Sequence, residues 1–157
     1  MKTENTYFAE IERIGHEFEE RRAAHQARKQ QVIDTYGWDS DEVKAWYAEE
    51  ADMVFPIAPG VNKAYRAYRM TQIRHSSEFE MEDFLWDKEV KDFVEALRKA
   101  GITEFAITNK STGLMENLHA FAAQGCTLEG LCKVTRKEDR WGEEEETGYQ
   151  GVRFKVN

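Results

Sequence analysis

The stretch that decides the fold runs from Gly101 to Val134 and reads GITEFAITNKSTGLMENLHAFAAQGCTLEGLCKV. Residues 101–108 and 128–134 read as strands, and residues 111–124 between them read as a helix. Gly101 and Gly125 stand where a helix would stop in a left-handed cap. The segment Asn109–Gly113 has the composition of a turn followed by a helix N-cap. The stretch therefore predicts a β-α-β unit.

The sequence on either side of this unit extends the sheet. Residues 79–84 suggest a strand whose acidic side chains alternate outward, and Asp87 is expected to cap the helix that follows. Residues 128–135 and 151–156 both alternate, and a charged excursion over residues 136–150 joins them, which predicts a hairpin with a long tip. The back half thus reads as a β-α-β-α-β-β module with a four-stranded mixed sheet.

A long first helix is predicted over residues 4–36, with an apolar stripe that begins at Tyr7 and ends at Phe18. From residue 19 to residue 31 the apolar residues are alanines, and the heptad lands on His25. Such a segment forms a helix readily but makes a poor core. Three hypotheses remain open: a solvated arm, a homotypic helix pair and a surface for another protein. The expected partner surface consists of Glu19, Arg22, Gln26 and Gln30.

Two further helices complete the front of the chain. One opens at Asp39–Glu42, where acidic residues suit the positive end of a helix dipole, and the other is predicted over residues 61–75. Pro56 and Pro59–Gly60 interrupt the chain between them. We therefore expect an α+β protein with a helical region at residues 1–60 and an α/β module at residues 61–157.

Composition limits the function classes. The 157 residues carry a formal net charge of −8, which disfavours nonspecific binding to nucleic-acid phosphates. No apolar leader or membrane-length segment is present in the sequence, so we expect a cytoplasmic protein without a membrane partner. Cys126 and Cys132 are the two cysteines, and their spacing on one strand predicts two free thiols.

The turn Asn109, Lys110, Ser111, Thr112 and Gly113 is the candidate anion-binding site, because a helix N-terminus offers free backbone N–H groups. It lacks the repeated glycines of a dinucleotide site and the pattern of a P-loop. The four histidines are scattered, so we expect no metal, no cofactor and no catalytic residue. A small-ligand or enzymatic module centred on this turn and His119 remains an alternative.

The predicted helix over residues 61–75 is a basic island, with four cations and no acidic residue over residues 61–77. Its candidate nucleic-acid contacts are Lys63, Arg66, Arg69 and Arg74. Interleaved with Tyr65 and Tyr68, they could grip a single strand by charge and stacking. The tyrosines, however, fall on the apolar face of the helix, which favours a place in the core.

Five segments of the back half resemble a family of uncharacterised small proteins encoded by gut Gram-positive bacteria and their conjugative elements. They are residues 102–109, 111–119, 125–131, 140–143 and 151–154, within a likeness that covers roughly residues 85–157. The resemblance implies a mobile-element context and no catalytic residue.

The leading hypothesis is a cytosolic, non-enzymatic protein that binds a protein partner or associates with itself through the first helix. One alternative is an acidic inhibitor of a host-defence enzyme that acts on nucleic acid, of the anti-restriction or anti-CRISPR type. The other is a single-stranded nucleic-acid accessory protein that uses the basic helix.

Overall fold

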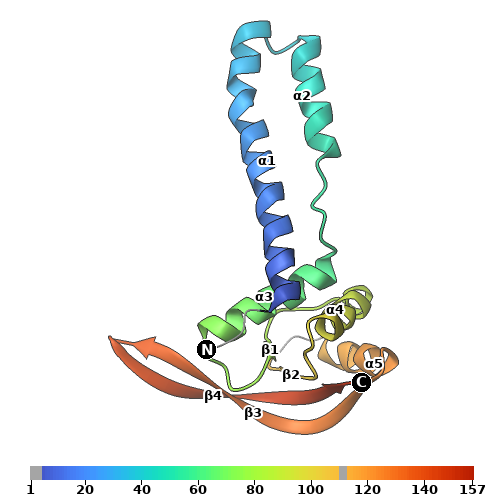
Figure 1. Cartoon of the computed structure of the whole chain (residues 1–157), viewed down its shortest axis with the longest axis vertical. Coiled ribbons are helices and arrows are strands. Elements are labelled where there is room, and N and C mark those ends of the chain that lie inside the picture. Colours follow the sequence, from blue (N-terminus) through green and yellow to red (C-terminus); the bar gives the residue numbers. More distant parts are fainter. Residues whose placement is uncertain (1–4, 110–112) are drawn as a thin grey trace. The chain divides into compact units, whose positions relative to one another are not determined.

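The computed structural model describes residues 5–109 and 113–157 (Figure 1). Within them it has five helices and four strands, so the α+β class is confirmed. The helices are α1 (Thr6–Tyr36), α2 (Asp41–Asp52), α3 (Pro59–Ile73), α4 (Asp87–Lys99) and α5 (Leu114–Ala123). The strands are β1 (Glu80–Met81), β2 (Glu104–Ile107), β3 (Cys126–Arg140) and β4 (Glu143–Val156).

The chain divides into two compact units. One holds residues 10–57, and the other holds residues 58–157 with the start of the chain up to Ala9. The division into domains at residue 60 stays a prediction. Each unit is described by itself below.

The larger unit contains the predicted four-stranded mixed sheet, with strand order β1-β2-β4-β3. β1 and β2 are parallel neighbours joined through α4, which makes them a simple β-α-β crossover. The Gly101–Val134 stretch is a different arrangement, because β2 and β3 each pair antiparallel with β4 and do not pair with each other. It is a split β-α-β unit, in which the last strand of the chain inserts between the two strands that α5 connects.

The core of this unit lies where α4 and α5 cover one face of the sheet (Figure 1). Four phenylalanines form its centre: Phe93 from α4, Phe121 from α5, Phe105 from β2 and Phe154 from β4. The rings of Phe105 and Phe154 stack with centroids 5.6 Å apart, and both lie within 5.3 Å of the Phe121 ring. The apolar faces of two helices and two strands therefore meet in a single aromatic cluster.

The C-terminal hairpin is confirmed, but the expectation of a long charged tip is wrong. Residues 136–140 pair in unbroken register with residues 143–147, so the excursion is itself a two-stranded ribbon. Trp141 and Gly142 form the tip with φ angles of 56° and 81°, the positive values that a two-residue type I′ turn requires. Across this ladder Lys137 faces Glu146, a favourable pair, whereas Glu138 faces Glu145 and Asp139 faces Glu144. Like charges directly opposite each other are destabilising, so cross-strand charge pairs alone do not account for the ribbon.

In the smaller unit, the face of α1 that carries His25 packs against α2, so the hypothesis of a solvated arm is wrong for this face. His25 is buried, with its ring stacked on Trp46 of α2 at a centroid distance of 4.3 Å. The Trp46 indole N–H donates to the His25 carbonyl at 2.9 Å, and the His25 Nε2 lies 3.1 Å from the Trp46 carbonyl. Because histidine combines a flat apolar ring with two polar nitrogens, it serves here as a core residue with satisfied partners.

Several predicted element boundaries need correction, and the strand expected over residues 79–84 is only Glu80–Met81. α3 begins at Pro59 instead of after Pro59–Gly60, since proline is favoured at the first helical position, where its missing N–H costs nothing. α4 begins at Asp87, and the capping position belongs to Trp86. α5 begins at Leu114, and residues 110–112 of its expected first turn lie outside the described residues.

Candidate functional site

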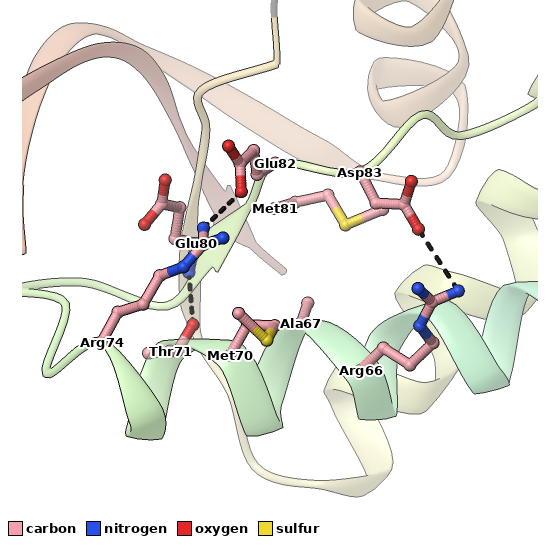
Figure 2. Close-up of a pocket in the computed structure, with 9 residues that line it drawn as sticks. All are labelled: Arg66, Ala67, Met70, Thr71, Arg74, Glu80, Met81, Glu82 and Asp83. Carbon is pink, nitrogen blue, oxygen red and sulfur yellow. Dashed lines mark hydrogen bonds and ion pairs between the residues drawn. The ribbon is translucent and has the colours of Figure 1, made fainter.

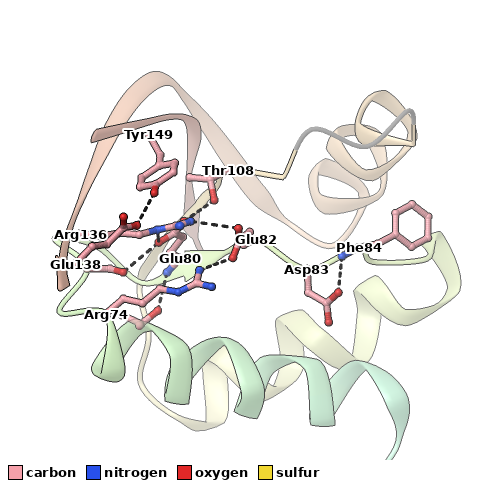
Figure 3. Close-up of polar contacts among 11 residues, drawn as sticks. Arg74, Glu80, Glu82, Asp83, Phe84, Thr108, Arg136, Glu138 and Tyr149 are labelled. Atoms are coloured by element: carbon pink, nitrogen blue, oxygen red, sulfur yellow. Dashed lines mark hydrogen bonds and ion pairs between the residues drawn. The ribbon is translucent and has the colours of Figure 1, made fainter. Parts of the chain in front are cut away.

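The site is built around a buried ion pair between the edge strand β1 and the hairpin strand β3 (Figure 3). Glu80 on β1 and Arg136 on β3 are 4% exposed each, although sequence alternation had pointed Glu80 outward. The guanidinium Nε of Arg136 donates to the two carboxylate oxygens of Glu80 at 2.9 and 3.1 Å, and Nη2 donates to Oε1. The outward expectation was wrong because this partner comes from a strand 56 residues away in the chain.

Neighbouring groups complete the hydrogen bonding of the buried carboxylate. The Thr108 hydroxyl donates to Glu80 Oε1 at 2.5 Å, and the Ser76 hydroxyl donates to Oε2 at 3.0 Å. Burial alone would raise the pKa of Glu80, but the hydrogen bonds from Arg136 and Thr108 outweigh it and lower that pKa below its ordinary value. A carboxylate that is stably ionised and fully bonded is a weak base, so Glu80 is poorly suited to accept a proton from a substrate.

Arg136 is held from its other side by the hairpin itself. Its guanidinium carbon lies 3.7 Å from the centroid of the Tyr149 ring on β4, and the Tyr149 hydroxyl donates to Glu138. The pKa of Arg136 is raised, chiefly by the hydrogen bond to Glu80. The distal hairpin is thereby tied to β1 by a planar cation clamped between a carboxylate and an aromatic ring.

Backbone hydrogen bonds tie the same part of β3 to the segment that precedes β1. The Ser77 N–H donates to the Thr135 carbonyl at 2.9 Å, and the Lys137 N–H donates to the Arg74 carbonyl at 2.9 Å. These bonds satisfy backbone groups on the side of β3 away from β4. A two-stranded ribbon is marginally stable alone, so these bonds and the buried ion pair stabilise the part of the hairpin that extends beyond the sheet.

The tip presents Trp141, whose side chain is fully exposed at 102% of its reference area. Two other tryptophans are also exposed, Trp86 at 57% and Trp38 at 64%, whereas Trp46 is buried. Tryptophan contributes more binding energy than almost any other residue at protein interfaces, and leaving it in water forfeits a large apolar area. Residues 143–146 beside the tip are four exposed glutamates.

A pocket of about 410 Å³ lies between α3 and β1 (Figure 2). Ala67, Met70 and Met81 give it an apolar lining, and Arg74 with Glu82 and Arg66 with Asp83 bridge it with ion pairs. The Thr71 hydroxyl accepts from the Glu80 backbone N–H at 3.0 Å. Arg66 and Arg74, two of the three arginines expected to contact nucleic acid, therefore face carboxylates of the same chain.

The remaining predicted site residues are not brought together. Lys63 forms an ion pair with Glu89 at 2.7 Å and donates to the Phe84 carbonyl, while Arg69 is exposed. Asn109 donates to the Asp83 carbonyl at 3.2 Å and Gly113 precedes α5 without a side-chain cap. Lys110, Ser111 and Thr112 lie outside the described residues, and His119 is exposed on α5.

The predicted partner surface on α1 lies partly against α2. Gln26 donates to Glu50 at 2.5 Å, and Arg22 lines a small cavity with Phe18 and Phe55. Gln30 donates to Asp34 on α1 itself, and Glu19 is exposed. This stripe is therefore a flank of the helical hairpin and only in part an open face.

Within the described residues, no group of three or more histidine, cysteine, aspartate or glutamate side chains is placed to hold a metal ion. None of the helices in that part of the chain is long and apolar enough to span a membrane. Both cysteines are free, and burial raises the pKa of the Cys126 and Cys132 thiols.

The fold and the site define a small α+β protein that projects an anchored, tryptophan-tipped hairpin. A family model described as a domain of unknown function, DUF7698, matches residues 63–156. This match spans more than half of the chain, and the protein belongs to that family. No curated protein and no solved structure is detectably similar to the chain.

Proposed function

We propose that this protein is a non-enzymatic protein-binding module whose main contact is the β3–β4 hairpin tip. The observation that carries the proposal is Trp141, a completely exposed tryptophan on a two-residue turn, at the end of a hairpin with a buried ionic anchor. A tryptophan has only two side-chain torsions, so it loses little conformational entropy when it enters a partner's pocket, and such residues dominate interface energies.

The alternative of an acidic inhibitor is supported by the charges beside the tip. Residues 143–146 are exposed glutamates on one strand of the hairpin. Together with Trp141 they would suit a partner that has an apolar pocket within a basic surface, as the nucleic-acid channels of defence enzymes do. The mobile-element context and the cytoplasmic location suggested by the sequence fit this alternative and remain part of the proposal.

Nothing in the geometry favours the nucleic-acid alternative over these two. Three of the four side chains predicted to contact nucleic acid are already paired. Lys63, Arg66 and Arg74 each lie within 4 Å of a carboxylate of the same unit. A cation already paired gains less from a phosphate, since the existing contact must be broken first.

The test is affinity capture of the tagged full chain from a lysate of its native host, with captured proteins quantified by mass spectrometry. Replacing Trp141 by alanine is expected to reduce recovery of the principal partner by about 30-fold, the effect of losing a contact of about 2 kcal/mol. The matched control is Trp38→Ala, which removes another exposed tryptophan, 64% exposed, from the other unit.

Equal recovery with the wild-type chain and Trp141→Ala would contradict the hairpin assignment. The capture is repeated at low and high salt, because attraction between the glutamates and a basic partner is screened by ions. A partner retained equally at both salt concentrations would rule out the acidic-inhibitor alternative but would remain consistent with the proposed protein-binding module.

A further inference from the structure

The exposed surface of α1 carries a charge pattern that the proposed hairpin contact does not use. Residues 10–20 hold five acidic groups and one basic group, and residues 21–31 hold four basic groups and no acidic group. The acidic half and the basic half are thus equal in length and opposite in sign. A helix of this kind is complementary to a second copy of itself only when the two run antiparallel.

The pattern is sharpest along one flank of the helix. Positions 10, 14, 17, 21, 24 and 28 follow the alternating spacing of four and three residues that forms a continuous seam on a helix. Their residues are Glu10, Ile14, Glu17, Arg21, Ala24 and Arg28. None of them is buried within the smaller unit. An open groove lies along this flank, lined by Ile14, Glu17, Glu20, Arg21, Ala24 and Pro56.

We propose that α1 is a self-association surface, through which two copies of the chain pair antiparallel along this flank. One register matches all six positions at once: Glu10 meets Arg28 of the second copy, Ile14 meets Ala24 and Glu17 meets Arg21. By two-fold symmetry each contact occurs twice. The small side chain of Ala24 leaves room for Ile14, so the centre of the pair has apolar contacts between its charged layers.

The same seam disfavours other ways of pairing. In a parallel pair each position would face its own copy, which would set Glu17 against Glu17 and Arg21 against Arg21. Like charges in contact at an interface oppose association. The acidic half followed by the basic half therefore selects both the occupant, a second copy of this chain, and its direction.

Within the described residues, the charged residues of the seam form only exposed ion pairs. Arg13 forms ion pairs with Glu10 and Glu17 on α1, and Arg28 lies 3.3 Å from Glu49 of α2. All of these side chains are more than half exposed. Exposed ion pairs contribute little to stability, so their partners can be exchanged when a second helix arrives.

The experiment is sedimentation equilibrium of the full chain from about 1 to 100 µM in low salt, about 0.02 M, and in high salt, about 0.5 M. We expect a dimer that dissociates at least tenfold more readily in high salt. Glu17→Arg and Arg21→Glu each place two like-charged pairs in the dimer, and each should raise the dissociation constant by at least tenfold. The double variant Glu17→Arg/Arg21→Glu restores opposite charges and should recover the dimer.

The rescue by the double variant separates pairing from a property of the single helix. Acidic residues early and basic residues late in a helix also interact favourably with its dipole. If the charges acted only through the dipole, the double variant would be impaired more than either single variant and would not recover the dimer. Glu19→Arg, the same change on another flank, is the matched control and should leave the dimer unchanged. Helix content by circular dichroism verifies that each variant is folded.

A chain that stays monomeric at every concentration in low salt would overturn the proposal. So would a dimer that resists both single reversals, since its interface would lie elsewhere. The result is independent of the hairpin, because Trp141→Ala should leave the dimer intact whether or not the hairpin binds a partner.

Discussion

Replacing Arg136 by alanine is expected to lower the free energy of unfolding of the larger unit by about 3–5 kcal/mol. The substitution leaves the Glu80 carboxylate buried without its cation, and the desolvation cost of that charge is no longer offset. It also removes the stack on Tyr149, so the distal hairpin loses its anchor as well as its buried partner. Urea unfolding measures the loss of global stability, and hydrogen exchange of the β3 and β4 amides measures the loss of the hairpin anchor.

The matched control is Arg74→Ala, which breaks the ion pair with Glu82 at a more exposed position. Exposed pairs contribute about 0.2–1 kcal/mol, so this variant should be nearly as stable as the wild type. The double variant Glu80→Gln/Arg136→Met should be less damaged than Arg136→Ala, because no buried charge is left alone. Equal stability of Arg136→Ala and Arg74→Ala would contradict the assigned role of the buried pair.

The same pair predicts a sensitivity to acid. The pKa of Glu80 is lowered in the folded protein relative to its ordinary value of 4.5. A lowered folded-state pKa means that the stabilisation is complete above the unfolded-state value and is lost as the pH falls through the folded-state value. We therefore expect stability to decline below about pH 4.5, and the decline should be smaller in Glu80→Gln/Arg136→Met. Parallel declines in the two proteins would show that other carboxylates are responsible.

Gly60→Ala is expected to destabilise the larger unit by about 2–3 kcal/mol, although the change adds only one methyl group. Gly60 is buried in the first turn of α3, where α3 packs against α4. A Cβ at this position would lie 2.3 Å from the Glu89 carbonyl oxygen and 3.0 Å from the Phe93 amide nitrogen. Both are backbone atoms of α4, so the two helices would have to move apart.

Gly37→Ala is the comparison for this effect. No atom lies within 4 Å of the Cβ that it would add, and its cost comes from the φ of +84° that a side chain disfavours, about 1–2 kcal/mol. Thermal unfolding of the two variants and the wild type measures the difference. A Gly60→Ala protein as stable as the wild type would show that α3 and α4 can adjust without loss.

The order of helices and strands could be predicted from the sequence because each depends on local signals. The glycines at 37, 101 and 125 all adopt positive φ where the pattern expected helices to stop. The alternating segments of the back half became strands, and Ser40 caps α2 beside the expected acidic turn. Patterns of this kind survive folding because backbone conformation and side-chain periodicity are set within a few residues.

The candidate site could not be predicted in the same way. Glu80 and Arg136 are ordinary charged residues of alternating strands, and their burial depends on the hairpin reaching β1. The length of that hairpin was missed because its charged strands resemble a loop in composition, and only the backbone ladder shows that they pair. In the sequence, His25 likewise interrupts the apolar stripe of α1, and only the tertiary structure brings Trp46 of α2 to it as a partner.

The sequence by itself therefore determined the α+β class, the order of the elements and the positions of most turns, all of which follow from short-range conformational preferences. Only the tertiary structure decided that β4 lies between β2 and β3, that Glu80 and Arg136 share a buried site, and that Trp141 stands exposed at a tight turn. These features depend on contacts between residues far apart in the chain, and the energy of such contacts is set by burial and by partners that no local pattern contains.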